Sequence, residues 1–324
     1  MPIVLRCDPK LLEKDLKDQV VIVTGANSGC GLETSRQLSK QGATVVLACR
    51  NGERGEAAAR EVNGVFIAPL DLSSLESVRS FVAAFKSKFD RLDALVNNAG
   101  VMACPHATTK DGFEWQFGCN HLAHFLLMQL LTPLLLTTAE KTSKPSRFVA
   151  LSSVVAGHST LMGPATVDLD DLNWKSRSYD EFPAYAQSKL CNYLHATEAG
   201  NRYPRDKLIS CSVHPGWVLS PLDSHVVEKI FGRGAIGKFV ADIFRKFFLW
   251  KGDMITPKDG AQTTLYCLLE DANKMQSGKF YSQFGVYKDK ASKPGGWPMV
   301  LVNPNITPEL GGKLWEVSEK LVGV

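Results

Sequence analysis

The chain has 324 residues, of which 44% are hydrophobic and 22% charged, and its formal net charge at pH 7 is +4. This balance is typical of a globular protein and gives no sign of nucleic-acid binding. Charges, Gly or Pro interrupt the apolar runs before the ~20 residues of a membrane span, and the N-terminus lacks the apolar core of a signal peptide, so we expect a cytoplasmic protein.

Strands and helices alternate along the first two thirds of the chain. Short β-branched runs predict strands, and apolar residues at helical spacing predict helices between them. The predicted strands cover residues 20–24, 44–49, 65–69, 92–97, 147–152 and 208–213, and the predicted helices 32–40, 53–62, 75–89, 114–136 and 184–201. Such alternation requires right-handed crossovers, so we expect one α/β domain over residues 1–324 with a doubly wound parallel sheet.

A glycine-rich loop follows the first predicted strand. Gly25, Gly29 and Gly31 stand between that strand and the next helix. At such a place missing side chains let the backbone approach a pyrophosphate, and the N-terminus of the helix supplies positive potential. We therefore expect a dinucleotide outside the carboxyl ends of the strands, as in a Rossmann fold. The loop residues expected to bind it are Gly25, Asn27, Ser28, Gly29, Cys30 and Gly31.

The residues that close the second and third strands bear on the choice of dinucleotide. The first of these positions faces the adenosine ribose, where an acid accepts the 2′-OH and a basic residue pairs with a 2′-phosphate. Arg50 stands there, so we predict NADP(H) rather than NAD(H). Asp71 and Leu72 close the third strand, and Asp71 is a candidate for a hydrogen bond to the adenine. The alternative role of Asp71 is the N-cap of the following helix.

A tyrosine and a lysine lie four residues apart in the last long predicted helix. Tyr185 and Lys189 therefore fall on one face of that helix. A free phenol has a pKa of about 10, and a cation held nearby favours the phenolate. The pair can thus supply a proton near neutral pH, which is the work of a general acid or base.

These motifs together resemble the short-chain dehydrogenase/reductase superfamily over about residues 17–320. The resemblance rests on TGANSGCG at 24–31, NNAG at 97–100, the serine pair at 152–153, YAQSK at 185–189 and His-Pro-Gly at 214–216. Two further segments, DGFEWQFGCNHLAHF at 111–125 and TPKDGAQT at 256–263, look like the retinol dehydrogenase-like branch. The segment LWEVSEKL at 314–321 is shared with light-dependent protochlorophyllide reductases.

The resemblance implies a catalytic tetrad. Asn120 would hold a helix kink and an ordered water, and Ser153 would hydrogen-bond the substrate oxygen. Tyr185 would be the general acid or base, while Lys189 would bind the nicotinamide ribose and lower the pKa of the tyrosine. Ser152 is the rival for the serine role, and we prefer Ser153 because the family's catalytic serine is the second of this pair.

The resemblance also implies further cofactor contacts. The residues expected near the ribose are Asn98, Ala99 and Gly100, and those expected near the carboxamide are Pro215, Gly216, Val218 and Ser220. No metal is expected, because His121, His124 and His214 follow family motif positions and lack carboxylate partners. The eight cysteines form no CxxC pair, which predicts reduced thiols.

Residues 226–250 differ in character from the rest, because aromatic and basic side chains alternate there. Three interpretations remain open: a surface subdomain packed on the body, a substrate lid, and a contact with a membrane surface. We favour an inserted helical lid at about residues 222–255, since a lipophilic substrate needs an apolar cover. A second insertion, at about 157–182, is expected to shape the mouth of the pocket.

The resemblance implies an NADP(H)-dependent oxidoreductase that interconverts a carbonyl and an alcohol on a lipophilic small molecule, retinoid-like or a bulky ketone or aldehyde. One alternative is light-dependent reduction of a tetrapyrrole, although the intact NNAG argues against it. The other is a non-catalytic NADP(H)-binding redox sensor, although such members commonly lose the tyrosine or the lysine. Membrane-bound retinol dehydrogenases usually carry an N-terminal apolar anchor, and residues 1–17 mix charged with apolar residues instead. A homodimer and a peripheral membrane contact stay open.

Overall fold

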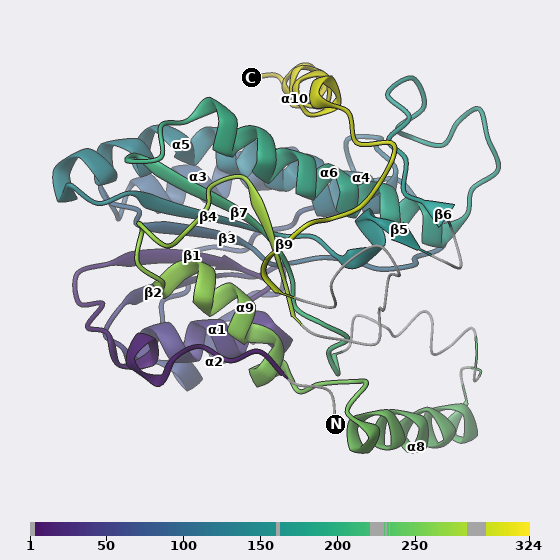
Figure 1. Ribbon diagram of the computed structural model, residues 1–324, viewed down its shortest axis with the longest axis horizontal. Coiled ribbons are helices and arrows are strands. Elements are labelled where there is room, and N and C mark those ends of the chain that lie inside the picture. The colour runs from purple at the N-terminus through teal and green to yellow at the C-terminus, as the bar shows by residue number, and fades with distance from the viewer. Residues whose placement is uncertain (1–3, 160–162, 221–229, 231, 233, 284–295) are drawn as a thin grey trace.

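A seven-stranded sheet is the middle layer of the computed structural model, which describes residues 4–159, 163–220, 230, 232, 234–283 and 296–324 (Figure 1). The strand order is β2-β1-β3-β4-β7-β8-β9, and every neighbouring pair is parallel except β8 and β9. The strands are β1 (Val20–Thr24), β2 (Thr44–Ala48), β3 (Ala94–Asn97), β4 (Ser146–Leu151), β7 (Leu208–His214), β8 (Lys279–Ser282) and β9 (Gly296–Met299).

Helices cover both faces of this sheet, which confirms the doubly wound α/β fold (Figure 1). One face carries α3 (Leu75–Lys86), α5 (Ala123–Thr142) and α6 (Glu181–Arg202), with α10 (Pro308–Val322) packed outside them. The other face carries α1 (Gly29–Lys40), α2 (Gly52–Val62) and α9 (Pro257–Leu269).

Strand β1 shows why the sheet is buried on both sides. Val20 and Ile22 face the core under α3, α5 and α6, whereas Val21 and Val23 face the core under α1, α2 and α9. Successive side chains of a strand point to opposite faces, so a run of apolar residues suits a strand with helices on either side.

Two predicted elements differ in the structure. The predicted strand at 65–69 is wrong, because only Val65 bridges to Val46 of β2, and the next backbone hydrogen bond to that edge runs from the Leu70 N–H to the Cys49 carbonyl (2.9 Å). Pro69 has no backbone N–H with which to extend a ladder. The predicted helix at 114–136 is longer and irregular, with α4 (Trp115–Phe117), a π-helical turn (Gly118–Leu122) and then α5 as far as Thr142.

The insertion that follows β4 contains a short 3-10 turn (Val154–Ala156) and the antiparallel pair β5 (His158–Ser159) and β6 (Gly163–Pro164). Asp171 then holds the loop that leads to α6. Its carboxylate accepts hydrogen bonds from the Lys175 N–H (2.6 Å) and the Ser176 hydroxyl (2.8 Å).

The excursion expected at residues 222–255 leaves the body next to the point where it returns. The Ile255 N–H donates to the Trp217 carbonyl (2.8 Å), and the Leu219 N–H donates to the Ile255 carbonyl (2.9 Å). Residues 221–229, 231 and 233 of this segment lie outside the described residues. The described part is mainly the helix α8 (Ala235–Lys251), which projects at the lower right of Figure 1.

Residues 5–14, which we term the N-terminal strap, cross the α9 face and include a 3-10 turn (Pro9–Glu13). The Leu5 N–H donates to Gln283 Oε1 (2.6 Å), and the Cys7 N–H donates to Gln262 Oε1 (3.0 Å). Lys14 Nζ donates to the Leu269 carbonyl (2.7 Å) at the end of α9. The strap therefore joins the start of the chain to elements formed near its end.

Candidate active site

The glycine-rich loop between β1 and α1 lies against the loop that follows β3. Gly25 has a positive φ of 63°, and a Cβ on it would lie 2.9 Å from Ala99 Cα. A Cβ on Gly31 would lie 2.5 Å from Asn98 Nδ2. The two loops can approach this closely only because glycine stands at both positions. Gly29 begins α1, so the backbone N–H groups of the first turn lie beside the same loop.

Thr24 ties these two loops together through one hydroxyl. Thr24 Oγ1 accepts hydrogen bonds from the N–H groups of Asn98 and Ala99, both at 2.9 Å, and the Asn98 side-chain amide donates to the Thr24 carbonyl (2.8 Å). Sequence reasoning gave no role to Thr24, although it opens the first motif. The threonine fixes the predicted ribose-binding residues relative to the predicted phosphate loop.

His124 extends this network into helix α5. Its Nδ1 lies 3.0 Å from the Asn120 carbonyl and its Nε2 lies 2.9 Å from Thr24 Oγ1. A carbonyl can only accept, so Nδ1 carries the proton, and the Thr24 hydroxyl donates to Nε2. Burial lowers the pKa of His124 to about 4, which keeps the imidazole neutral. His124 entered our predictions only as a metal ligand that we rejected, and its place in the NHLAH motif was the available signal for this role.

Asn120 lies in the π-helical turn and is fully buried. Its side-chain oxygen accepts from the Val101 N–H (2.8 Å), and its Nδ2 donates to the Val101 carbonyl and to Ser188 Oγ, both at 2.9 Å. The Ser188 hydroxyl in turn donates to the Tyr185 carbonyl (2.7 Å). Asn120 thus links an irregular turn of the long helix to the helix that carries the tyrosine and the lysine.

The two serines after β4 have different surroundings. The Ser152 hydroxyl donates to the Lys189 carbonyl (2.7 Å), so it holds β4 against α6. Ser153 Oγ accepts only a long contact of 3.4 Å from the Val155 N–H. The Ser153 hydroxyl proton has no acceptor among the described hydrogen bonds, which leaves it available to a ligand.

Tyr185 and Lys189 lie on one face of α6, with Lys189 Nζ 5.6 Å from the centre of the phenol ring. Lys189 Nζ donates to the Leu151 carbonyl (3.1 Å), and no carboxylate pairs with it in the described part of the chain. Burial lowers the pKa of Lys189 to about 8. A Cβ on Gly100 would lie 3.5 Å from Lys189 Nζ and 3.2 Å from Asn120 Oδ1, so Gly100 packs closely against both side chains.

The segment predicted to hold the carboxamide lies beside the phosphate loop. Ser220 Cβ is 3.8 Å from the position of a Cβ on Gly29. A Cβ on Gly260 of α9 would lie 2.5 Å from Val218 Cγ2 and 2.8 Å from Cys30 Sγ. The first turn of α9 can therefore pack against both segments only with glycine at this position. Pro215 and Gly216 precede this segment, and Gly260 was not singled out from the sequence.

The adenosine end of the predicted site is more open. Arg50 is exposed after β2 and, among the described residues, has no ion-pair partner. Asp71 is already engaged, because its carboxylate accepts from Ser73 Oγ (2.7 Å) and pairs with Lys110 Nζ (2.9 Å). Burial alone would raise the pKa of Asp71, but these hydrogen bonds outweigh it and lower the pKa. The N-cap of α3 is Ser74, not Asp71, and Leu72 is half-buried beside them.

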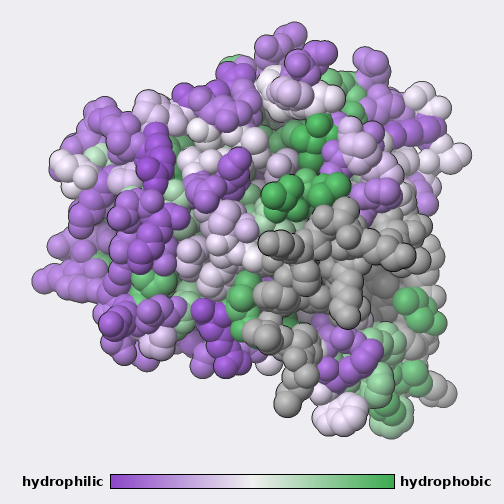
Figure 2. All heavy atoms as spheres, viewed as in Figure 1, coloured by the Kyte–Doolittle hydropathy of each residue, from purple (hydrophilic) through white to green (hydrophobic). Residues whose placement is uncertain are grey.

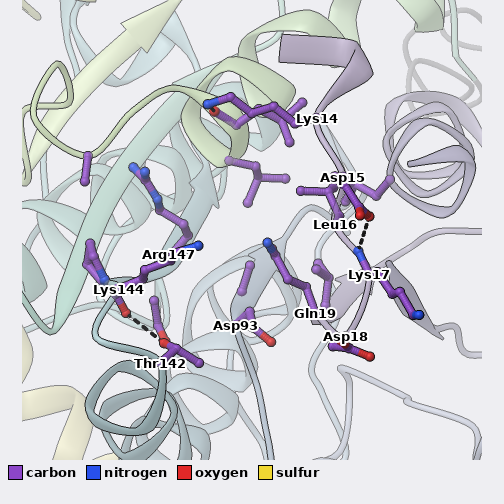
Figure 3. A pocket seen from close by; sticks show the side chains of 18 of the residues that line it. Lys14, Asp15, Leu16, Lys17, Asp18, Gln19, Asp93, Thr142, Lys144 and Arg147 are labelled. Atoms are coloured by element: carbon purple, nitrogen blue, oxygen red, sulfur yellow. Dashed lines mark hydrogen bonds between the residues drawn. The ribbon is translucent and has the colours of Figure 1, made fainter. Parts of the chain in front are cut away.

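A separate cavity of about 750 Å³ lies at the amino ends of β1, β3 and β4, the opposite edge of the sheet (Figure 3). Its charged lining is balanced, with five cations, Lys14, Lys17, Arg91, Lys144 and Arg147, and five carboxylates, Asp15, Asp18, Asp93, Glu270 and Asp271. None of the predicted site residues lines it. Ligands of open α/β sheets bind outside the carboxyl ends, so we place the functional site at the other edge.

The cysteines are spread over the fold and lie mostly in its core. All eight cysteines are free, and only Cys30 is not fully buried. Burial raises the pKa of the Cys30 thiol to about 12, so it stays protonated beside the phosphate loop. Across the described ranges no group of three or more His, Cys, Asp or Glu side chains is placed to hold a metal ion.

The chain is similar in sequence to short chain dehydrogenases, and in particular to retinol dehydrogenases. The short chain dehydrogenase family model matches residues 19–165. Human retinol dehydrogenase 13 is 38% identical over 314 residues, which is 94% of this chain and 85% of the relative. Mouse retinol dehydrogenase 11 is 36% identical over 315 residues, 95% of this chain and 88% of the relative.

Solved structures with a similar fold were also found. A crystal structure of an uncharacterised protein from Mycobacterium paratuberculosis has a TM-score of 0.70 and 32% identity, covering 96% of both chains. A short chain dehydrogenase from Shigella flexneri, complexed with NADP, has a TM-score of 0.59 and 22% identity, covering 83% of this chain and 98% of that one. At that identity the Shigella structure shows the shared fold alone.

The expectation of a cytoplasmic protein is contradicted. That expectation took the apolar runs to be too short for a membrane span, whereas Pro133 lies inside α5 without ending it. The continuous helix Trp115–Thr142 has 28 residues and is long and apolar enough to cross a membrane, with 67% of its most apolar window buried inside the protein. The relatives are retinol dehydrogenases, a branch with membrane-bound members. The prediction of a cytoplasmic location is therefore wrong.

Proposed function

Because the chain belongs to the short-chain dehydrogenase family, in its retinol dehydrogenase-like branch, we propose that it interconverts a carbonyl and an alcohol on a lipophilic, retinoid-like substrate with NADP(H) as cofactor. The observation that carries the proposal is the buried Lys189 ammonium, held beside the Tyr185 ring with no described carboxylate to neutralise it. Such a cation stabilises the phenolate that forms when Tyr185 gives up its proton.

The described residues fit a nicotinamide dinucleotide. Glycine at the start of α1 leaves backbone N–H groups uncovered for the phosphates, and Gly100 brings the predicted ribose-binding loop close to Lys189 Nζ and Asn120 Oδ1. Lys189 would hold the nicotinamide ribose, and Val218 with Ser220 would hold the carboxamide. When bound, the nicotinamide supplies or accepts a hydride.

The chain's own residues would handle the oxygen of the substrate. In the reducing direction negative charge develops on the carbonyl oxygen, where the Ser153 hydroxyl can donate a hydrogen bond and Tyr185 can donate its proton. In the oxidising direction Tyr185 accepts the alcohol proton. Ser152 is excluded from this role in our proposal, because its hydroxyl is committed to the Lys189 carbonyl.

The preference for NADP(H) is proposed from Arg50. Its guanidinium is exposed after β2. Ala48, two residues before Arg50, accepts a hydrogen bond from the Gly25 N–H (2.9 Å), so the end of β2 lies next to the phosphate loop. A 2′-phosphate at the adenosine ribose would meet this cation, and guanidinium groups bind phosphate in a bidentate way. Asp71 would accept a hydrogen bond from the adenine beside those it already accepts from Ser73 and Lys110.

A lipophilic substrate is proposed from the relatives' names and from the inner face of α8. Phe248 packs on Trp217, with ring centres 5.1 Å apart, and Trp217 lies next to Val218 in sequence. This apolar pair stands at the edge of the proposed nicotinamide site, where a cover for a hydrocarbon chain would be needed. We retain the lid role for this inner face.

The test is a panel of retinal, aliphatic aldehydes, steroids and quinones with NADPH, followed by loss of cofactor absorbance. We expect the highest kcat/KM for long apolar carbonyls. Tyr185→Phe should reduce kcat by roughly 10²-fold or more while nucleotide binding stays, because the ring remains and the proton donor is lost. Ser153→Ala should act in the same direction, whereas Ser152→Ala serves as the matched control.

Near-normal turnover by Tyr185→Phe would remove the proposed acid. NADPH binding with no turnover on any carbonyl would instead favour the redox-sensor alternative. Turnover of protochlorophyllide only under illumination would favour the light-dependent one.

A further inference from the structure

Helix α8 carries an exposed apolar stripe. Of the nine exposed large hydrophobic side chains among the described residues, six belong to this helix: Phe239, Val240, Ile243, Phe244, Phe247 and Trp250. Trp250 is 79% exposed, Phe239 66% and Phe247 51%. Exposed apolar side chains are ordinary when scattered, but a contiguous group marks a contact surface.

The stripe has a defined direction. Phe239, Ile243 and Phe247 follow one another at four-residue spacing, so they lie along one side of the helix. The opposite side faces the body, where Ala241 is buried and Phe248 packs on Trp217. The helix is thus held by one face while the other stays open to solvent. Figure 2 shows apolar side chains at the lower right, where Figure 1 places α8.

The charge of α8 suits an anionic partner. Its sequence has three lysines and one arginine against one aspartate. Lys246 is exposed and has no ion-pair partner among the described residues, while Lys251 pairs with Asp253 (2.7 Å) and Arg245 with Asp242 (3.6 Å). An apolar stripe with cations beside it is the pattern of a helix that lies in the plane of a membrane interface.

Other occupants fit less well. A helix of 17 residues with five charged side chains is too short and too polar to span a bilayer. At 1.5 Å per residue it is about 25 Å long, so a stripe about 10 Å wide covers about 250 Å². A stable homodimer needs about 800 Å² on each partner. A bilayer imposes no such minimum, and it accepts tryptophan at its interface.

We propose that α8 docks the protein peripherally on an anionic membrane surface through Phe239, Ile243, Phe247 and Trp250. The helix joins the body at Trp217 and Ile255, next to Val218 of the proposed nicotinamide site. Docking would bring this edge of the site to the bilayer, where an apolar substrate dissolves. That benefit rests on the proposed function, but the docking itself and its test do not.

The test is co-sedimentation of the full chain with vesicles of phosphatidylcholine alone or mixed with phosphatidylserine in about equal parts. We expect binding to the mixed vesicles, weakened by salt because screening reduces the contribution of Lys246. The triple variant Phe239→Gln, Ile243→Gln, Phe247→Gln should bind at least about tenfold more weakly. Glutamine keeps the helix propensity high, and unchanged circular dichroism and NADPH binding show that the fold is intact.

Matched controls separate the stripe from general surface properties. Val300→Gln with Val324→Gln removes exposed apolar side chains elsewhere and should leave vesicle binding unchanged. Lys246→Glu should weaken binding about tenfold, whereas Lys88→Glu should not.

Wild-type protein that stays in the supernatant with both vesicles would overturn the proposal, as would a triple variant that binds like the wild type. A triple variant that changes only from dimer to monomer would identify the stripe as a self-association face and also overturn it. Because no turnover is measured, these outcomes are independent of the proposed reaction.

Discussion

Lys189 combines burial with a positive charge that no described carboxylate neutralises. Burial lowers its pKa from the ordinary value of 10.5 to about 8. The unfolded chain therefore binds more protons than the folded one between pH 8 and 10.5, so this group makes the protein more stable as pH rises through that window. Below pH 8 the buried charge costs about 3 kcal/mol of folding free energy.

Lys189→Met should separate function from stability. At pH 7 we expect the free energy of unfolding to rise by up to about 3 kcal/mol, because the buried charge is gone, while turnover falls by at least about 10²-fold. Denaturant unfolding at several pH values is the measurement. The wild type should gain stability between pH 8 and 10.5, and the variant should lack that gain. A variant less stable than the wild type at pH 7 would show that the charge is not the dominant cost.

Arg50→Asp should change the cofactor preference. The substitution replaces a proposed phosphate partner with a repelling charge, so NADPH binding should weaken by about one to a few kcal/mol while NADH binding is spared or improved. Titration of both nucleotides by fluorescence measures this. Arg54→Asp, on the exposed first turn of α2, is the control. Equal loss of both nucleotides would exclude Arg50 as the selector.

At the scale of elements, the site depends on how the long helix Trp115–Thr142 is interrupted. Asn120 lies in the π-helical turn, and its carbonyl accepts a hydrogen bond from His124 Nδ1. His124 Nε2 in turn accepts from Thr24, which contacts the loop after β3. A neutral histidine with one fixed tautomer is required for this chain of hydrogen bonds. The helix therefore positions the proposed cofactor residues from a distance.

His124→Leu should loosen that connection. It leaves the Thr24 hydroxyl and the Asn120 carbonyl without their partner, so NADPH affinity should fall by about 1–3 kcal/mol. His124→Gln restores part of the bonding and should recover part of the affinity. The control is His195→Leu, a buried histidine packed on Phe148 and Trp315, which should alter stability but not nucleotide affinity. Equal effects of both leucine variants on nucleotide binding would contradict a positioning role.

Sequence patterns predicted the elements that have strong local signals. The predicted strands at β1, β2, β4 and β7 are mostly buried, and the glycine loop follows β1 as expected. The segment 65–69 is also apolar, so its pattern predicted a strand. Pro69 has no N–H to donate to a ladder, and only Val65 pairs with β2. β8 and β9 were missed because neither has a long apolar run and their pairing depends on tertiary contacts.

The candidate site also combines residues that the sequence reveals with contacts that only the fold reveals. Motif residues and the Tyr185–Lys189 spacing are visible in the chain, whereas the difference between Ser152 and Ser153 depends on which hydroxyl meets the Lys189 carbonyl. The bond from His124 to Thr24 joins residues 100 positions apart, and the packing of Gly260 against Cys30 joins segments even farther apart. No local pattern encodes such contacts.

At the scale of the whole molecule, α10 closes the core that lies over α5 and α6. Trp315 is 3% exposed, with ring centres 5.1 Å from Phe125 and 5.5 Å from His195. The Arg202 guanidinium stacks 4.7 Å from its ring centre. The last helix therefore contributes Trp315 to a buried aromatic cluster with Phe125 and His195.

Trp315→Ala should destabilise the protein by about 3–5 kcal/mol, because removing a buried indole leaves a cavity. Thermal unfolding is the measurement, and activity assayed well below the midpoint should remain near normal. Trp250→Ala, at an exposed position of α8, should change stability by no more than about 0.5 kcal/mol. A similar loss from both substitutions would mean that burial in this cluster is not what stabilises the fold.

The N-terminal strap also sets the order of events during synthesis. Leu5 forms its hydrogen bonds with Gln283, 278 residues later in the chain. At ribosomal speeds that partner emerges on the order of tens of seconds after Leu5 itself. Throughout that interval Leu5 lacks the partner that it has in the folded protein. Docking of this part of the strap therefore waits until translation has passed Gln283, when most of the chain has already been made.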